Sequence, residues 1–292
     1  MFKTKIGIII FLGLLIIGMV IIYSNFSLGV TNYNLSFPNL PEAFDGYKIV
    51  QLTDLHSKSF GKNNERLIEK IDKESPHILL MTGDMINTED KDYGVFFSLV
   101  DNLVSKYESY FIVGNHEQNL KDDQLDFLYK ELRAAGVTVL DNELRTIEKD
   151  GQVINIYGMW FNLRYYSDQR NQIMRDDPER YYFSLDKMEK VMGSYDSSKF
   201  SILLTHNPLY FDTYSQWGAD LTLTGHIHGG MIRLPFLGGI FSPEKTFFPD
   251  YDAGLYSHGD RKMIVGRGLG NGNLGFRFLN SPELIVINLH SK

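Results

Sequence analysis

The chain has 292 residues, of which 43% are hydrophobic and 22% are charged, so it is long enough for one large domain or two small ones. Its net charge of −7 argues against non-specific binding of DNA or RNA, and its 13% of aromatic residues exclude a mainly disordered chain. Because cysteine is absent, disulfide scaffolds, thiolate metal sites and cysteine nucleophiles are excluded as well.

The N-terminal segment predicts a membrane-spanning helix. Residues 6–23 carry no charge and are just long enough to cross the hydrocarbon core of a bilayer. Lys3 and Lys5 precede this segment, which favours a cytoplasmic N-terminus at residues 1–5 and an extracytoplasmic location for the rest of the chain. We therefore expect a single-pass protein of the cell membrane, with its folded part outside the cytoplasm.

Two alternatives to a retained anchor remain open. A cleaved signal peptide has a shorter apolar core and a small-x-small cleavage site, which residues 23–27 lack. The segment could also be the core helix of a soluble protein. Residues 24–44, which contain Asn, Ser, Gly and Pro, are predicted to be a tether, so the folded domain is expected at residues 45–292.

Beyond the tether, short apolar runs end abruptly at polar residues. Five such runs are predicted to be buried strands, at residues 47–53, 78–82, 110–113, 200–205 and 221–224. Residues 63–74 and 93–107 have apolar side chains at helical spacing between the first three runs. This strand–helix–strand order predicts an α/β fold with a largely parallel sheet.

Potential metal ligands follow each of the five runs. They are two Asp, one Asn and five His: Asp54, His56, Asp84, Asn115, His116, His206, His226 and His228. Ligands of open α/β sheets bind at the carboxyl ends of the strands, and these side chains suit divalent metals without sulfur. If the chain is extended there, residues two apart, such as Asp54 and His56, point to the same side. Gly83, Gly114 and Gly225 would allow sharp turns beside the ligands. The pattern predicts a metal centre at one edge of the sheet.

Taken in order, these motifs resemble the calcineurin-like metallophosphoesterase family. The matching motifs are Asp54-x-His56, Gly83-Asp84, Gly114-Asn115-His116-Glu117, His206 and Gly225-His226-Ile227-His228. Gly229-Gly230, the run Arg233 to Phe236 and the tail from Arg267 to Glu283 are similar to an exported or membrane-anchored bacterial subgroup, which includes UDP-2,3-diacylglucosamine pyrophosphatase-type enzymes. The resemblance implies a four-layered α/β sandwich around two mixed sheets, with the metals at one rim.

The resemblance also implies a role for each matching residue. One divalent metal ion would be bound by Asp54, His56 and His228, the other by Asn115, His206 and His226, and both by the bridging carboxylate of Asp84. His116 would act at the leaving-group oxygen, by stabilising the transition state or by donating a proton. Glu117 would orient the loop or the imidazole, although a plain surface carboxylate is an equal alternative. The ions would be Mn²⁺, Zn²⁺ or Fe, and a hydroxide bridging them would attack phosphorus in line.

Two positions depart from the family pattern. Asn87 stands where the family often has a second aspartate after Gly83-Asp84, and Met231 stands where the subgroup commonly has glutamine. Neither change removes an implied ligand. They leave open the substrate preference and the surroundings of the ligands.

Residues 158–195 interleave aromatic side chains with arginines. One interpretation is a lid in which arginines, with Arg164 and Arg170 as candidates, bind the phosphate of the substrate. The alternative is an ordinary helix that packs its aromatic side chains on the sheet. Residues 235–250 are rich in Gly, Pro and Phe and are predicted to form a long loop that could line the substrate cleft or enter the lipid interface.

The leading functional hypothesis is a membrane-anchored, extracytoplasmic, dinuclear-metal phosphodiesterase or pyrophosphatase that acts on a lipid- or envelope-linked phosphate. One alternative is a phosphodiesterase or phosphomonoesterase acting on soluble nucleotides. Another is a metal-binding protein without turnover, against which the complete set of implied ligands argues.

Overall fold

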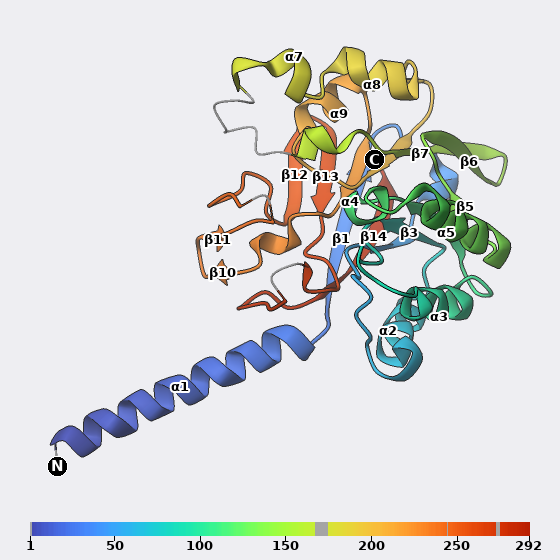
Figure 1. Ribbon diagram of the computed structural model, residues 1–292. Coiled ribbons are helices and arrows are strands. Elements are labelled where there is room, and N and C mark those ends of the chain that lie inside the picture. Colours follow the sequence, from blue (N-terminus) through green and yellow to red (C-terminus); the bar gives the residue numbers. More distant parts are fainter. Residues whose placement is uncertain (1, 167–174, 244, 273–274) are drawn as a thin grey trace.

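Two six-stranded sheets pack face to face, and helices cover their outer faces. The computed structural model describes residues 2–166, 175–243, 245–272 and 275–292. Figure 1 shows the layered body of the protein, with helix α1 projecting from one side of it. The order helix, sheet, sheet, helix confirms the predicted four-layered α/β sandwich.

The first sheet contains the strands predicted near the start of the domain. In spatial order its strands are β1 (Gly29–Phe37), β14 (Glu283–Ser291), β2 (Tyr47–Leu52), β3 (Ile78–Thr82), β4 (Glu108–Ile112) and β5 (Thr138–Val139). All neighbouring pairs are parallel except β14 and β2. Because β14 runs against β2, its first residue lies at the rim where β2 ends.

The second sheet combines parallel central strands with antiparallel edges. In spatial order its strands are β12 (Gly254–His258), β13 (Arg261–Val265), β9 (Leu221–Thr224), β8 (Ser201–Thr205), β7 (Gln152–Met159) and β6 (Glu143–Lys149). The pairs β12–β13 and β6–β7 are antiparallel hairpins. A small ribbon of β10 (Arg233–Leu234) and β11 (Gly238–Gly239) lies outside both sheets.

Helices cover the two sheets on opposite sides. The longer helices are α2 (Glu65–Glu74), α3 (Gly94–Leu103) and α5 (Asp122–Ala135) beside the first sheet, and α8 (Leu185–Met192) and α9 (Phe211–Trp217) beside the second. Shorter helical turns are η1 (Glu42–Phe44), η2 (Lys62–Asn64), α4 (Asn115–Gln118), η3 (Leu163–Tyr166), α7 (Pro178–Tyr181) and η4 (His228–Gly230).

Side-chain alternation along the strands builds three large cores among the described residues, beside a small cluster of Phe211, Met263 and Val265. In β3, Ile78 and Leu80 point into the core between the two sheets, whereas Leu79 and Met81 point into the core beneath α2, α3 and α5. The third core lies beneath α8 and α9 and is rich in aromatic residues, including Trp217. Because both faces of the central strands are covered, every residue of β3, β8 and β9 is buried.

The five predicted strands correspond to β2, β3, β4, β8 and β9, and the two predicted helices to α2 and α3. The segment predicted to be a tether differs from expectation. Residues 29–37 form β1, which pairs along its whole length with β14, starting with Gly29 opposite Glu283. As an edge strand, β1 is largely half-exposed and alternates polar with apolar residues, so its composition resembles that of a loop.

Helix α1 (Phe2–Phe26) is the one helix among the described residues that is long and apolar enough to cross a membrane, over residues 4–26. The domain does not bury this apolar stretch. Its length and composition suit either a membrane span or a signal sequence. Because β1 follows directly and runs parallel to β14, the chain enters the domain at the rim where β2 ends.

Candidate metal centre

The residues predicted to bind metal lie at this rim, where strands of both sheets end. Asp54 and His56 follow β2, Asp84 follows β3, and Asn115 and His116 begin α4 after β4. The second sheet contributes the histidines that follow β8 and β9, namely His206, His226 and His228. All are buried except the half-buried pair in α4. The sheet edges therefore bring together eight side chains that are far apart in the sequence.

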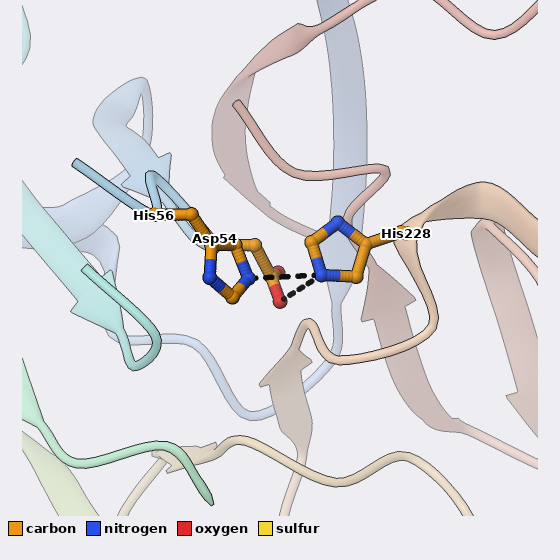
Figure 2. Close-up of side chains that lie close together, drawn as sticks. All are labelled: Asp54, His56 and His228. Carbon is orange, nitrogen blue, oxygen red and sulfur yellow. Dashed lines mark hydrogen bonds and ion pairs between the residues drawn. The ribbon is translucent and has the colours of Figure 1, made fainter. Parts of the chain in front are cut away.

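A first group of potential ligands joins Asp54, His56 and His228, whose donor atoms lie within 4.8 Å of one another. Figure 2 shows these side chains pointing toward one another. The Nε2 atoms of the two histidines are 3.0 Å apart, and Nε2 of His228 lies 3.4 Å from Oδ1 of Asp54. Two imidazole nitrogens and a carboxylate oxygen that converge in this way can coordinate one divalent cation.

A second group joins Asp84, His206 and His226. Oδ2 of Asp84 lies 3.1 Å from Nε2 of His206 and 3.7 Å from Nε2 of His56, which belongs to the first group. The carboxylate of Asp84 therefore lies between the two groups. A third grouping brings His116 to His56 and Asp84, so His116 borders the same centre.

The backbone is unusual at five of these residues. The φ angle is positive at Asp54 (50°), His56 (47°), Asp84 (53°), His226 (72°) and His228 (53°). Such conformations cost about 1–3 kcal/mol each for residues other than glycine, and they cluster at functional sites. They also correct the expectation of an extended chain. Tight turns direct the two pairs of ligands, and His226 and His228 lie in different groups.

Glycines allow these turns to approach one another closely. A Cβ atom at Gly114 would lie 2.3 Å from Oδ1 of Asp84, and one at Gly225 would lie 2.0 Å from Oγ1 of Thr53. Both distances are far below van der Waals contact. Any larger residue at either position would displace the turn that carries a potential ligand, as expected for glycines beside such residues.

Hydrogen bonds from outside the centre orient two of the histidines. Nδ1 of His206 pairs with the carbonyl of Thr82 at 2.7 Å, and Nδ1 of His56 pairs with Oδ1 of Asn87 at 2.9 Å. Because both partners accept hydrogen bonds, each ring carries its proton on Nδ1 and directs the lone pair of Nε2 into the centre. Asn87 thus orients an imidazole, and its amide in turn donates a hydrogen bond to Asp90 at 3.2 Å.

The donor set fits a pair of divalent cations. Oδ1 of Asn115 is buried and accepts no hydrogen bond from the described residues. Leaving a buried amide oxygen unpaired is costly, and coordination of a cation would satisfy it. Carboxylate, imidazole and amide donors are also the mixed N/O set that borderline divalent metals accept.

Nearby carboxylates strongly raise the pKa of one histidine, His206. Burial would lower the pKa of His206, but the carboxylate of Asp84, together with that of Asp54, outweighs burial and raises this pKa to about 10. Burial likewise would raise the pKa of Asp84, yet His206 and His56 hold it below its usual range. Without a cation, a proton on His206 therefore balances the buried negative charge.

Metal removal is expected to make the fold sensitive to alkaline pH. Protonated His206 stabilises the folded protein because its folded-state pKa, about 10, exceeds the ordinary value of about 6.5. This stabilisation is complete below about pH 6.5 and is lost as the pH rises through about 10. We expect the thermal unfolding midpoint of metal-stripped protein to fall over this interval, and Mn²⁺ to abolish the fall because the cation replaces the proton. Identical pH profiles with and without Mn²⁺ would contradict this expectation.

Glu117 holds two turns of the centre together. Its fully buried carboxylate accepts hydrogen bonds from the backbone N–H groups of Asp84 (2.9 Å), Met85 (2.8 Å), Ile86 (3.3 Å) and Gly114 (2.8 Å). The prediction that it orients the loop is confirmed, and the alternative of a surface carboxylate is wrong. Burial, followed by the proximity of Asp84, raises the pKa of Glu117 to about 7.

Replacing Glu117 by glutamine is expected to destabilise the protein by about 2–4 kcal/mol. The new amide group would face two backbone N–H groups in either orientation, because each carboxylate oxygen accepts from at least two of them. Urea denaturation of Glu117→Gln, compared with the substitution Glu69→Gln at an exposed position of α2, measures the effect. An unchanged free energy of unfolding would show that these hydrogen bonds contribute little.

His116 is oriented by Thr88. The backbone N–H of Thr88 donates to Nδ1 of His116 at 3.2 Å, and the Thr88 hydroxyl donates to the carbonyl of His116 at 2.9 Å. Burial lowers the pKa of His116, which favours the neutral ring. Since Nδ1 accepts a hydrogen bond, the proton of this neutral ring lies on Nε2.

Most aromatic side chains of the 158–195 segment pack into the outer core of the second sheet. The rings of Phe161 and Phe183 stack with their centroids 4.4 Å apart, and both are buried. This is the packing that the alternative interpretation predicts. Tyr166 also reaches the metal centre, with its ring edge-to-face against that of His226 at 4.9 Å.

The two candidate phosphate-binding arginines are not brought to the centre by any contact that the structure describes. Arg164 is exposed, its Nε donates to Oδ1 of Asn162 at 3.1 Å, and its guanidinium lies over the ring of Tyr165. Arg170 lies outside the described residues. Their role in substrate binding stays a prediction.

Two residues between β13 and β14, Arg277 and Asn280, support the centre although no sequence motif predicted them. The side chain of Arg277 is completely buried, and its Nη2 lies 3.4 Å from Nδ1 of His228. The amide of Asn280 donates to the carbonyl of His228 at 2.7 Å. An arginine in a polar, glycine-rich stretch carries no signal of burial, so only its place in the fold reveals this role.

Comparison with known proteins is consistent with this geometry. A family model described as calcineurin-like phosphoesterase matches residues 47–230. The metallophosphoesterase YkuE of Bacillus subtilis is 30% identical over 267 residues, which cover 89% of this chain and 85% of that protein. The phosphodiesterase YaeI of Escherichia coli is 24% identical over 250 residues, which cover 83% and 82%. A solved structure, phosphopantetheinyl hydrolase from Mycobacterium tuberculosis, matches with a TM-score of 0.48 and 14% identity over 75% of this chain and 89% of that chain.

Proposed function

Because the chain belongs to the calcineurin-like phosphoesterase family and is therefore a metal-dependent phosphohydrolase, we propose that it cleaves a phosphodiester or pyrophosphate bond in a lipid- or envelope-linked substrate. The observation that carries the proposal is the convergence of two groups of buried donors on Asp84 at the rim where the chain leaves α1. The narrower likeness to UDP-2,3-diacylglucosamine pyrophosphatase-type enzymes stays a prediction.

Seven residues would hold two divalent cations. One cation would be bound by Asp54, His56 and His228, the other by Asn115, His206 and His226, and Asp84 would contribute to both. Three observations support this division: the separate donor groups, the unsatisfied oxygen of Asn115, and the Nδ1 hydrogen bonds that direct Nε2 of His56 and His206 inward. Mn²⁺, Zn²⁺ and Fe all suit such a set.

When bound, the two cations supply an activated water at neutral pH and offset the charge that develops on the phosphoryl oxygens. The protein supplies position and a hydrogen-bond donor. Thr88 holds the neutral ring of His116 so that Nε2 carries the proton, and this N–H would donate a hydrogen bond to the leaving-group oxygen as negative charge develops on it. The backbone N–H of His116 donates to Oδ1 of Asp84 at 2.8 Å, which fixes His116 relative to the shared carboxylate.

The proposal of a lipid-linked substrate rests on where the domain meets α1. Apolar side chains are exposed near this point: Phe236, Leu237, Phe276 and Leu279. The backbone N–H of Leu279 donates to Ser24 at the end of α1, and Arg233 in β10 donates to the carbonyl of Phe278. Figure 1 shows β10 and β11 on the side from which α1 projects. With α1 retained in a membrane and residues 1–5 in the cytoplasm, these side chains would lie at the outer lipid interface.

Hydrolysis of bis-p-nitrophenyl phosphate by the full chain in lipid nanodiscs tests the reaction. We expect metal-stripped protein to be inactive and Mn²⁺ to restore turnover. A phosphodiester presented in the same bilayer should then be hydrolysed with a higher kcat/KM than its short-chain soluble analogue. Two bound metals without turnover of any phosphoester would indicate a binding protein. Turnover confined to soluble nucleotides would refute the lipid-linked part of the proposal.

A further inference from the structure

The end of α1 is bound tightly into the domain through Asn25. Its side-chain amide donates to the carbonyl of Arg277 at 2.9 Å and accepts from the backbone N–H of the same residue at 2.9 Å. The side-chain oxygen also accepts from the amide of Asn271 at 3.1 Å, and the backbone carbonyl of Asn25 accepts from Nζ of Lys58 at 2.8 Å. The amide thus bonds both backbone polar groups of a residue 252 positions later in the chain.

Arg277, to which Asn25 is hydrogen-bonded, lies between the end of α1 and the metal centre. The guanidinium of Arg277 donates from Nε to the carbonyl of Gly270 at 2.8 Å, with a second bond from Nη2 to the same carbonyl. Nη1 lies 3.4 Å from the carbonyl of Asn280. A buried guanidinium with several carbonyl acceptors is held in a single geometry. Arg277 therefore fixes Gly270 and Asn280, which lie on either side of it in space, relative to one another.

The segment between β13 and β14 forms a wall of the first group of potential ligands. The N–H of Gly270 donates to the carbonyl of Asp54 at 2.6 Å. A Cβ atom at Gly268 would lie 2.7 Å from Cβ of Asp54, and one at Gly272 would lie 3.0 Å from Nε2 of His228. The three glycines therefore pack directly against Asp54 and His228, so a shift of residues 268–272 would displace one of these two side chains.

We propose that Asn25 is a positioning residue for the metal centre, because it binds the backbone of Arg277 and thereby holds residues 268–272 against Asp54 and His228. The last turn of α1 is then part of the enzyme and not only a leader or a tether. Cleavage before residue 26 would remove this fastening. The inference rests on the proposed metal centre and adds that its affinity for metal depends on the end of the membrane-side helix.

Mn²⁺ binding to the full chain in detergent tests this role without turnover. We expect Asn25→Ala to raise the free Mn²⁺ concentration needed to half-fill one of the two sites by about tenfold, as found for residues that orient metal ligands. Amide hydrogen exchange of residues 275–280 in metal-free protein should become faster. Asn25→Asp keeps the acceptor for Arg277 and Asn271 but loses the donor, so an intermediate effect is expected.

Ser27→Ala is the matched control, because the hydroxyl of Ser27 donates to Ser281 at 2.8 Å from the same helix end but does not hold Arg277. Wild-type Mn²⁺ affinity in Asn25→Ala, or an equal loss in Ser27→Ala, would overturn the inference. So would a mature membrane enzyme whose mass shows cleavage before residue 26. If the wild-type chain bound no metal, the proposed function would fail, and the exchange experiment would still decide whether Asn25 holds the Arg277 segment.

Discussion

Asp84→Asn is expected to reduce kcat/KM for bis-p-nitrophenyl phosphate by at least about 1,000-fold and to lower the metal content of the protein. Oδ2 of Asp84 lies between Nε2 of His206 and Nε2 of His56, while Oδ1 accepts the N–H of His116. Asparagine keeps one oxygen and loses the charge. Its oxygen can accept from His116 or face the two imidazoles, but it cannot do both.

Metal analysis of the purified variant separates loss of binding from loss of chemistry. Asp72→Asn is a suitable control, because this carboxylate pairs with Lys106 and Tyr107 on the outer helical layer. It should retain two metals and wild-type turnover. An Asp84→Asn enzyme with two bound metals and an unchanged kcat would disprove the bridging role proposed for this carboxylate.

His116→Ala is expected to lower kcat by about 100-fold or more while leaving the metal content and KM nearly unchanged. The reason is that the ring of His116 is held by Thr88 with its proton on Nε2, next to the donor groups rather than within the proposed ligand set. The loss should be smaller for a p-nitrophenyl ester than for an alkyl ester, because p-nitrophenolate delocalises its negative charge and needs less stabilisation by the Nε2–H of His116.

Thr88→Val provides the matched comparison for this experiment. It removes the hydroxyl bond to the carbonyl of His116 but keeps the backbone N–H that orients Nδ1, so only a modest change in kcat is expected. If His116→Ala lost one metal, His116 would be a ligand, as its grouping with His56 and Asp84 also permits. Equal losses for the p-nitrophenyl and alkyl esters would argue against a role of His116 at the leaving-group oxygen.

The departure at Asn87 acquires a physical explanation from the structure. The family often has aspartate there, and Asn87 still supplies the oxygen that accepts from Nδ1 of His56. Asp90 accepts hydrogen bonds from the backbone N–H and the side-chain amide of Asn87. The carboxylate therefore lies behind Asn87, one hydrogen bond further from the imidazole of His56. The substitution therefore preserves the orientation of His56 and moves the charge behind it.

Strands could be predicted wherever both faces are covered. Every residue of the runs at 78–82 and 221–224 is buried, because each run lies inside a sheet that packs against a second sheet and a layer of helices, and the runs contain only Ile, Leu, Met and Thr. β1 was missed because one of its edges is open and its outward side chains are polar. An edge strand is specified by its partner, here β14, which lies more than 240 residues later.

The class of chemistry could be predicted from the residues alone, because imidazole, carboxylate and amide side chains that follow apolar runs of a parallel sheet meet where those strands end. The potential ligands and the apolar length of α1 could be read in the same way. The division of these residues into two groups, and the joining of two turns by Glu117, became visible in the folded chain. The tertiary structure alone revealed that Arg277 and Asn25 stand behind the centre. Those roles depend on contacts between segments up to 252 residues apart, and no local pattern encodes such contacts before the chain has folded.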